Sequence, residues 1–496
     1  VGGMIFMNSW DGVYLPLLVG AELVRRLLVN GSLSLEDLWK TARFALVIAV
    51  LTVVLYALWF VSFESQASGV MPNLVFPTQW QQFFLQFGIF LVMLVPYLAV
   101  QVWRAGRRFN WQAGLLAVVF LMSTLILLAG VRGKQIWDAP ERLGAGDAQY
   151  NAAVGERNNI YTGADFDQSW ATVMGDVVAK RADALPSEAL LLVMIFLVVG
   201  RLFAKPDPEF ETSPANGFAL LLIGAGAVLT LAPDFVYLKD NFGVRMNTVF
   251  KLYYQGWILF SIASAFALWA ILAGARARGR GKIPVLVGRG VYGLVVAVFI
   301  MAGMVYPVMG FRYRAIIEGG RYCDEKALAK VGQECPEQRP LTLNGVPTMV
   351  SQNEYQAVQC LQNVEKDRDA ILVEAPGGAY NSRQSRFSGL TGIPTLIGWQ
   401  NHEGQWRGES YGKFVGSRVG DVQELYTTTD WTRAWALIDQ YGIDYIVVGE
   451  AERQMVDEMI AAGGSSTLAD GLSKFDGILE PVCATETVQV YRTAPN

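Results

Sequence analysis

Long apolar stretches separated by short polar loops fill the first 310 residues of the chain. A helix needs about 20 residues to cross the hydrocarbon core of a bilayer, which is about 30 Å thick. The pattern predicts about eight crossings, at residues 4–28, 41–63, 80–103, 112–131, 186–204, 215–237, 250–274 and 289–310. The first stretch is interrupted by Asn8, Asp11 and Pro16, and we expect only its second part to lie in lipid.

Lys and Arg are concentrated in alternate loops of this region. Loops rich in these residues face the cytoplasm in most membrane proteins. Basic residues cluster at 25–43, 104–108, 201–205 and 276–289, whereas the short intervening loops 64–79 and 234–249 carry only Lys239 and Arg245. We therefore predict an integral protein of the plasma (cytoplasmic) membrane whose chain beyond residue 310 is extracytoplasmic.

The outside loop at residues 132–185 is too long for a simple connector. Side chains recur in it at helical spacing, with polar residues between them, at Phe166, Trp170, Val173, Val177 and Arg181. This spacing predicts an amphipathic helix. Two positions for the helix remain open, one on the membrane surface and one packed on the soluble domain.

Beyond residue 310 the apolar runs become short, and strand patterns alternate with helical ones. We expect strands at 370–374, 395–399, 445–449 and 488–492, and helices at 431–441 and 452–462. This alternation predicts an α/β domain. The predicted fold is therefore a helical polytopic membrane domain at 1–310, including the long outside loop, and a soluble α/β domain at 311–496.

Composition supports a lipid-embedded chain and narrows the range of partners. Hydrophobic residues make up 52% of the sequence and charged residues only 17%, which is unlike a soluble globular domain. The formal net charge is −4 and no basic face is present, so we expect no nucleic acid partner. The chain opens without an initiator Met, and we expect that N-terminal helices are missing from it.

All four cysteines lie in the soluble domain. This distribution indicates an oxidising compartment and disulfides. We predict that Cys323 pairs with Cys335 and that Cys360 pairs with Cys483. A zinc site is the rival interpretation, but the chain has one His and no C-x-x-C motif, so we predict no metal site.

A dense polar cluster occupies residues 234–257, where one apolar stretch ends and the next begins. Ionisable groups at membrane depth usually line a cavity or a substrate path. Arg and Lys together suit a phosphate, and a helix start adds free backbone N–H groups. The predicted substrate-binding residues here are Lys239, Arg245, Asn247, Lys251, Tyr254 and Gln255. In the alternative interpretation, the cations pair with Asp234 and Asp240 and only hold the turn.

Three carboxylates are candidates for a general base: Asp11, Asp240 and Glu403. For Asp11 the alternative is the capping of a helix that begins at Gly12 or Val13. Glu403 belongs to a segment, residues 392–408, that resembles a sugar site because aromatic faces stack on a pyranose and charged groups hold its hydroxyls. Its candidate residues are His402 as a catalytic group and Trp399, Trp406 and Arg407 as substrate contacts, and the alternative is a packed loop.

Five blocks, kept in order, carry a resemblance to a known family. They are SFESQASGVMPN, KDNFGVRMNTVFKLYYQGW, APGGAYNSR, LTGIPTLIGWQNHEGQWRG and YGIDYIVVGEAER. Together they resemble the YYY family of uncharacterised polytopic membrane proteins, although the tyrosine triplet that names the family is absent here. That family is similar in layout to the GT-C superfamily of integral-membrane glycosyltransferases, which use lipid-phosphate sugars as donors and carry an extracytoplasmic domain after the helices.

The resemblance implies a glycosyltransferase, of hexosyltransferase type, that moves a sugar from a polyprenyl-phosphate donor to a glycan, lipid or protein acceptor. No cofactor beyond this donor is predicted, and dependence on a divalent metal stays open. A transporter or flippase of a lipid-linked substrate would instead require paired inverted halves with broken helices. A structural or assembly subunit would leave the cluster from Lys239 to Lys251 salt-bridged inward.

Overall fold

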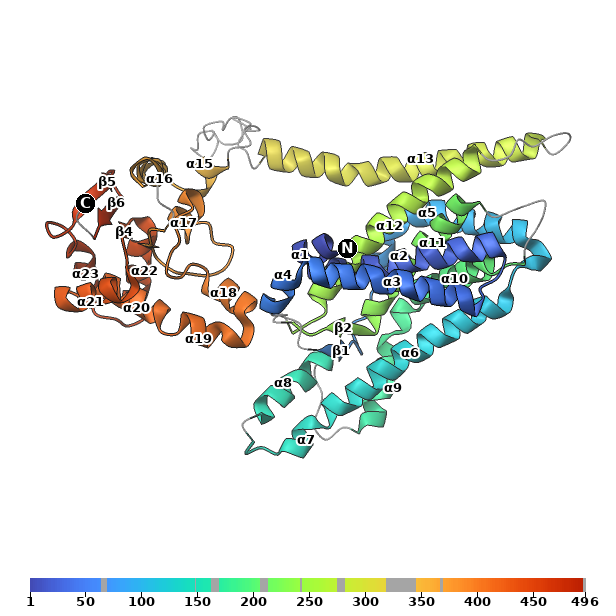
Figure 1. The fold of residues 1–496 in the computed structure, drawn as a ribbon, viewed down its shortest axis with the longest axis horizontal. Coiled ribbons are helices and arrows are strands. Elements are labelled where there is room, and N and C mark those ends of the chain that lie inside the picture. The colour runs from blue at the N-terminus through green and yellow to red at the C-terminus, as the bar shows by residue number, and fades with distance from the viewer. Residues whose placement is uncertain are drawn as a thin grey trace, which may run out of the picture. The chain divides into compact units, whose positions relative to one another are not determined.

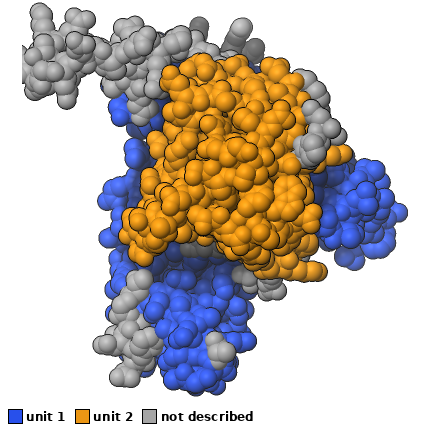
Figure 2. Space-filling model, turned by 90° about the vertical axis from the view of Figure 1, so that its left-hand side faces the viewer, with its two compact units in different colours: residues 1–63, 67–318 blue, residues 64–66, 319–496 orange. Residues whose placement is uncertain are grey.

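A computed structural model describes residues 1–63, 69–147, 149–161, 169–205, 213–240, 243–273, 282–317, 345–365 and 369–493. The chain divides into two compact units, residues 1–63 with 67–318 and residues 64–66 with 319–496 (Figure 2). The first unit is almost entirely helical, and the second combines helices with a four-stranded sheet (Figure 1).

Among the described residues, seven helices of the first unit are long and apolar enough to cross a membrane. They are α3 (Leu35–Leu55), α5 (Trp80–Ala105), α6 (Trp111–Trp137), α10 (Leu185–Leu202), α11 (Pro214–Leu231), α12 (Met246–Leu272) and α13 (Lys282–Arg312). Several begin at side-chain caps: Ser34 forms a capping box with Asp37 at α3, and Ser213 caps α11 ahead of Pro214. These caps fix the residues at which α3 and α11 begin.

The predicted crossing at residues 4–28 is not among these seven helices, because the stretch is not one continuous helix. Helix α1 (Gly2–Met7) ends at Asn8, whose backbone is extended, and a 3₁₀ turn, η1 (Ser9–Val13), leads into α2 (Tyr14–Asn30). Helix α2 has 17 residues, at the lower end of the range for a membrane-spanning helix, and it corresponds to the second part of the stretch, which was expected to lie in lipid. The break places Asp11 inside the helical unit.

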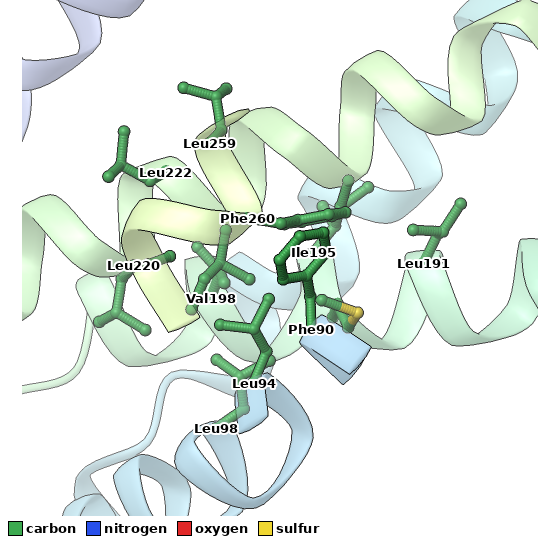
Figure 3. Close-up of a cluster of buried hydrophobic side chains, with 14 of the residues drawn as sticks. Phe90, Leu94, Leu98, Leu191, Ile195, Val198, Leu220, Leu222, Leu259 and Phe260 are labelled. Atoms are coloured by element: carbon green, nitrogen blue, oxygen red, sulfur yellow. The ribbon is translucent and has the colours of Figure 1, made fainter. Parts of the chain in front are cut away.

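The membrane helices share one apolar core. Phe90 of α5, Ile195 of α10 and Phe260 of α12 lie together in it, as Figure 3 shows. Helix α11 packs between α10 and α12, and α2 lies along α11 and α3. This packing holds η1, the 3₁₀ turn between α1 and α2, beside the first turns of α12.

The long loop folds into a small helical cap on the first unit. It contains α7 (Ala139–Leu143), α8 (Tyr150–Ile160) and α9 (Trp170–Lys180), and it packs on a two-stranded sheet of β1 (Val70–Pro72) and β2 (Val236–Leu238). The predicted amphipathic helix is confirmed as α9, and the predicted position Phe166 lies outside the described residues. Val173 and Val177 of α9 are buried in this cap, so the unit itself covers the apolar face of the helix.

The second unit is built on a mixed sheet with strand order β3-β4-β6-β5. Strands β3 (Leu372–Val373) and β4 (Tyr445–Val448) are parallel, and β6 (Gln489–Arg492) is antiparallel to both β4 and β5 (Glu480–Ala484). Alternate residues of β4 enter two cores, Tyr445 and Val447 on one face and Ile446 and Val448 on the other. Helices therefore cover both faces of the sheet, which is the predicted α/β architecture.

Helices α16 (Gln352–Val364) and α17 (Arg386–Thr391) belong to one core, and α20 (Arg418–Thr427), α21 (Trp431–Tyr441) and α22 (Glu450–Ala461) belong to the other. The predicted disulfide Cys360–Cys483 is confirmed and ties α16 to β5. The other predicted pair, Cys323 with Cys335, lies outside the described residues. The predicted strand at 395–399 is wrong, because this extended segment makes only isolated bridges, at Thr395 and Trp399.

Candidate functional site

The polar turn between α11 and α12 is built around the buried carboxylate of Asp234. Its Oδ1 accepts hydrogen bonds from the Thr78 backbone N–H at 3.0 Å and from the Thr78 hydroxyl at 2.8 Å. Arg245 Nη1 lies 2.8 Å from the same oxygen, and the Tyr253 hydroxyl lies 2.6 Å from the Thr78 hydroxyl. Arg245 therefore has a carboxylate partner within the protein, as the alternative interpretation of the sequence expected.

A second ion pair extends this network. Arg181 donates to Glu188 Oε1 at 3.2 Å and to the backbone carbonyl of Asp234. Its guanidinium also lies 4.4 Å from the centre of the Phe235 ring. Because a buried charge is costly unless it is paired and hydrogen-bonded, the two Arg and the two carboxylates stabilise each other.

The remaining predicted residues of the turn also contact protein partners. Lys239 forms an ion pair with Glu156 of α8. Asn247 Nδ2 donates to Asp240 Oδ2 at 2.9 Å. These contacts tie the cap and the start of α12 together, so the turn is a scaffold whose polar groups are largely used.

Asp11 lies in η1, and its side chain does not cap a helix. The residue before η1 is Asn8, and neither η1 nor α2 has a side-chain cap. Asp11 Oδ1 instead accepts from Gln255 Nε2 of α12 at 2.7 Å and from Asn8 Nδ2 at 3.2 Å. The Tyr14 hydroxyl donates to Gln255 Oε1 at 2.5 Å, which fixes the orientation of the amide.

Lys251 lies one helical turn before Gln255, so both residues are on the same side of α12. Within the residues that the structure describes, no ion pair or hydrogen bond reaches Lys251 Nζ, and none reaches Asp11 Oδ2. Tyr254 is 61% exposed beside them. The structure thus groups four predicted residues, a carboxylate, an amide, a phenol and a cation, where η1 meets α12.

The second unit contains a cavity of about 730 Å³. The loop between β3 and α17, the extended segment at 393–399 and helix α18 (Gln400–Arg407) surround it. Its lining includes Gln384, Ser385, Arg386, Thr395, Gly398, Trp399, His402, Glu403 and Trp406. Four residues predicted from the segment 392–408 are therefore brought together, and Arg407 reaches the cavity only through its partner Glu403.

Aromatic rings form one side of this cavity. His402 lies 5.9 Å from both Trp399 and Trp406, measured between ring centres, and Tyr380 lies 5.7 Å from Trp399. Trp406 Nε1 donates to His402 Nε2 at 3.1 Å, which leaves that nitrogen an acceptor. Arg407 Nε donates to Glu403 Oε2 at 2.6 Å along the same helix.

The backbone around the cavity is held in uncommon conformations. Tyr380 and Ser385 both have positive φ, at 63° and 57°. Gly398 approaches Ser385 so closely that a Cβ on Gly398 would lie 1.9 Å from the Ser385 hydroxyl oxygen. Positive φ in non-glycine residues persists where the surroundings enforce it, often at ligand sites.

A buried ionic cluster lies directly behind the cavity. Arg386 contacts Glu354 at 2.5 Å, Glu452 at 2.8 Å and Glu374 at 3.5 Å. Burial raises the pKa of Glu374, whereas Arg386 lowers the pKa of Glu452 against the effect of burial, together with the Ala375 and Gly449 N–H groups. The sequence did not predict this cluster, because its four members are scattered over 98 positions and share no spacing.

Metal binding has no support in the described residues, where no three His, Cys, Asp or Glu side chains gather into a suitable group. The cavity residues Gln384 and Thr395 were also not among the site residues predicted from the sequence. Their only signal was their position in the sequence, because Thr395 lies within the segment 392–408 and Gln384 directly follows the APGGAYNSR block. A role for them follows only from the fold.

Seven candidate membrane helices followed by a mixed α/β unit define an integral membrane protein of the polytopic class. Residues 1–260 match the model of the family described as "Uncharacterized membrane protein (DUF2298)", and the chain belongs to this family. Comparisons with curated proteins and with solved structures give no match. The disulfide in the second unit is consistent with an extracytoplasmic side for that unit.

Proposed function

We propose that this protein is a membrane glycosyltransferase of GT-C layout that transfers a sugar from a polyprenyl-phosphate donor to an extracytoplasmic acceptor. One observation carries the proposal. The carboxylate of Asp11 is oriented through one oxygen by Gln255, while its other oxygen has no partner among the described residues, and Lys251 lies one turn away on α12.

The chemistry divides between these two charges. Asp11 Oδ2 takes the proton of an acceptor hydroxyl while the acceptor oxygen bonds to the anomeric carbon of the donor. The bond from that carbon to the phosphate oxygen breaks, and the polyprenyl phosphate leaves with the electron pair. Lys251 stabilises the negative charge on the departing phosphate. Tyr254, exposed on the same helix, contacts the sugar or the lipid phosphate.

Lys251 replaces Arg245 as the main phosphate contact in this proposal. Arg245 is held by Asp234, and Lys239 is held by Glu156. An ammonium without a carboxylate partner is the stronger attraction for an anion, because no internal ion pair has to be broken first. Arg245 then serves to hold the turn from which α12 begins.

The test uses the purified full chain in lipid with a polyprenyl-phosphate sugar and a mixture of acceptors. Replacing Asp11 by Asn should lower transfer by about 10²–10⁴-fold, the usual contribution of a general base. Donor binding should be unchanged. Asp183→Asn alters an exposed carboxylate outside this network, so it is the matched control and should keep full transfer.

The second variant addresses the phosphate. Lys251→Ala should weaken donor binding by about 1.5–3 kcal/mol, the range for a hydrogen bond to a charged group, and Lys251→Arg should restore most of it. Lys40→Ala, on α3, is the control and should bind donor normally. Normal transfer by Asp11→Asn would exclude Asp11 as the base, and donor flipping without any transfer would favour the transporter.

The proposed side of the membrane is tested separately. We expect the second unit outside the plasma membrane, because its sequence follows the last basic loop and it holds a disulfide. A cysteine introduced at the exposed Ser466 should react with an impermeant reagent on intact cells, whereas one at Arg107 should react only after permeabilisation. The reverse result would overturn the orientation.

A further inference from the structure

The cavity of the second unit has the size of a small-molecule site. Its volume of about 730 Å³ lies within the range of about 300–1,000 Å³ that ligand pockets occupy. All of its lining residues belong to this unit, so the cavity does not depend on how the two units are arranged. Its chemistry is therefore complete within the described residues of one unit.

An exposed aromatic platform forms its entrance. Trp406 is 57% exposed although it lines the cavity, and the ring of Trp399 is fixed because its Nε1 donates to the backbone carbonyls of Asn381 and Gln384. The face of an aromatic ring is negative. It attracts the C–H groups of a pyranose, which neighbouring oxygens polarise positively.

Two buried acceptors in the cavity wall have no hydrogen-bond partner. Gln384 Oε1 and Thr395 Oγ1 are inaccessible to solvent and accept no hydrogen bond within the described protein. Leaving such an atom unsatisfied in the protein interior is energetically unfavourable. Both residues line the cavity and are only partly buried. A rotation of either side chain would bring its oxygen to the cavity surface, where a hydroxyl donor of a sugar would satisfy it.

The charges around the cavity are already paired. Arg386 is held by three buried glutamates, and Glu403 is held by Arg407. Among the described residues that line the cavity, no Lys or Arg is left to bind a carboxylate, sulfate or phosphate on a ligand. The cavity therefore favours an uncharged ligand over an acidic one.

We propose that this cavity binds a neutral saccharide, whose pyranose ring stacks on Trp406 and Trp399 and whose hydroxyls donate to Gln384 and Thr395. Its assignment as the acceptor glycan rests on the proposed transferase function, whereas saccharide binding itself does not. The strained loop at Tyr380 and Ser385 keeps the wall in place before the ligand arrives, which lowers the entropy lost on binding.

The test measures binding to the full chain in detergent by calorimetry. The probes are neutral oligosaccharides of glucose, mannose, galactose and N-acetylglucosamine, each paired with a uronic acid counterpart where one exists. At least one neutral probe should bind, and its acidic counterpart should bind at least tenfold more weakly. Trp406→Ala should weaken the neutral ligand at least tenfold, whereas Trp435→Ala, at a half-exposed Trp on α21, should not.

The variant Thr395→Val tests whether ligand binding can be weakened without a loss of stability. The change removes an unpaired buried hydroxyl and keeps the shape of the side chain, so the melting temperature should stay the same or rise. Binding of the neutral saccharide should nevertheless weaken about fivefold, as for the loss of one hydrogen bond. Unchanged binding in both Thr395→Val and Trp406→Ala would overturn the site, as would tighter binding of acidic probes or no binding of any neutral probe.

The failures of the two proposals are distinguishable. Asp11→Asn should lose transfer and keep saccharide binding, because Asp11 belongs to the other unit. A wild-type protein that binds neutral saccharides through Trp406 but transfers nothing would support the cavity and refute the transferase.

Discussion

The two units bury charge in different ways. In the first, Asp234 and Glu188 face Arg245 and Arg181, so two carboxylates meet two cations. In the second, three glutamates surround the single cation Arg386. Backbone N–H groups stabilise the carboxylate charge that the single cation does not balance. Those of Phe387 and Ser388 donate to Glu374 at 3.0 and 2.8 Å.

The comparison shows that a dense stretch of polar residues need not be a functional site, because its polar groups can all be used within the protein. Residues 234–251 are the densest polar stretch of the membrane half, yet most of their charges hold the turn. The groups that we propose as ligand contacts accept or donate no hydrogen bond and form no ion pair among the described residues: Lys251 Nζ and Asp11 Oδ2 in the first unit, and Gln384 Oε1 and Thr395 Oγ1 in the second. Four predictions test this contrast.

The largest effect is expected at Arg386. Replacing it by Met leaves three buried carboxylates without their cation, and breaking a buried ion pair in this way costs about 3–5 kcal/mol. Hydrogen exchange of β4 in the full chain should report the loss. Arg433→Met breaks the exposed pair with Glu424 and should change nothing measurable. Equal effects of the two variants would contradict a structural role for the buried cluster.

Reduction of the disulfide should affect the second unit alone. Cys360 and Cys483 are 123 positions apart, and removal of a native disulfide typically costs about 2–5 kcal/mol. Faster hydrogen exchange is therefore expected in α16 and β5 of a Cys360→Ala/Cys483→Ala variant. The membrane helices should exchange as in the wild type, because the first unit contains no cysteine. A change spread over both units would show that they are energetically coupled.

Variants at Arg245 and at Lys251 should have different effects: the first should lower stability, and the second should weaken donor binding. Arg245→Ala removes the partner of a buried carboxylate and should lower the free energy of unfolding by about 1.5–3 kcal/mol. Adding Asp234→Asn should recover part of that loss. Lys251→Ala should leave the melting temperature unchanged, since no described carboxylate pairs with its ammonium, which lies 5.7 Å from the centre of the Phe250 ring. If the Arg245→Ala protein were as stable as the wild type but bound the donor weakly, Arg245 would be a contact of the donor phosphate and not a structural residue.

The smallest effect concerns Lys474, a half-buried cation that has no carboxylate partner among the described residues. Lys474 Nζ donates to the backbone carbonyls of Leu425 and Gly471, and burial lowers its pKa to about 7. Since the unfolded chain then holds more protons above that pH, stability should rise with pH, by about 1 kcal/mol between pH 6 and 8. The melting temperature of Lys474→Met should lack this rise. A fall in wild-type stability over the same interval would contradict the lowered pKa.

The sequence by itself determined the elements whose signal is local. Apolar length identified seven membrane helices, and apolar periodicity placed α21 at 431–441, the bounds that the structure has. The confinement of the cysteines to one region indicated disulfides, whereas the pairing of Cys360 with Cys483 was one of the alternatives that four cysteines allow and was confirmed by the structure. Each of these signals comes from the residue types themselves, which partition between lipid, core and solvent in the same way wherever the chain folds.

Only the tertiary structure decided which polar groups are used up and which are left for a ligand. Asp11 meets Gln255 across 244 positions, and Arg245 meets Thr78 across 167. No periodicity links such pairs, because the packing of α2, α5 and α12 brings them together. The free energy of a charge depends on those neighbours, so the same Arg or Lys is a structural residue or a ligand contact according to what the fold places beside it.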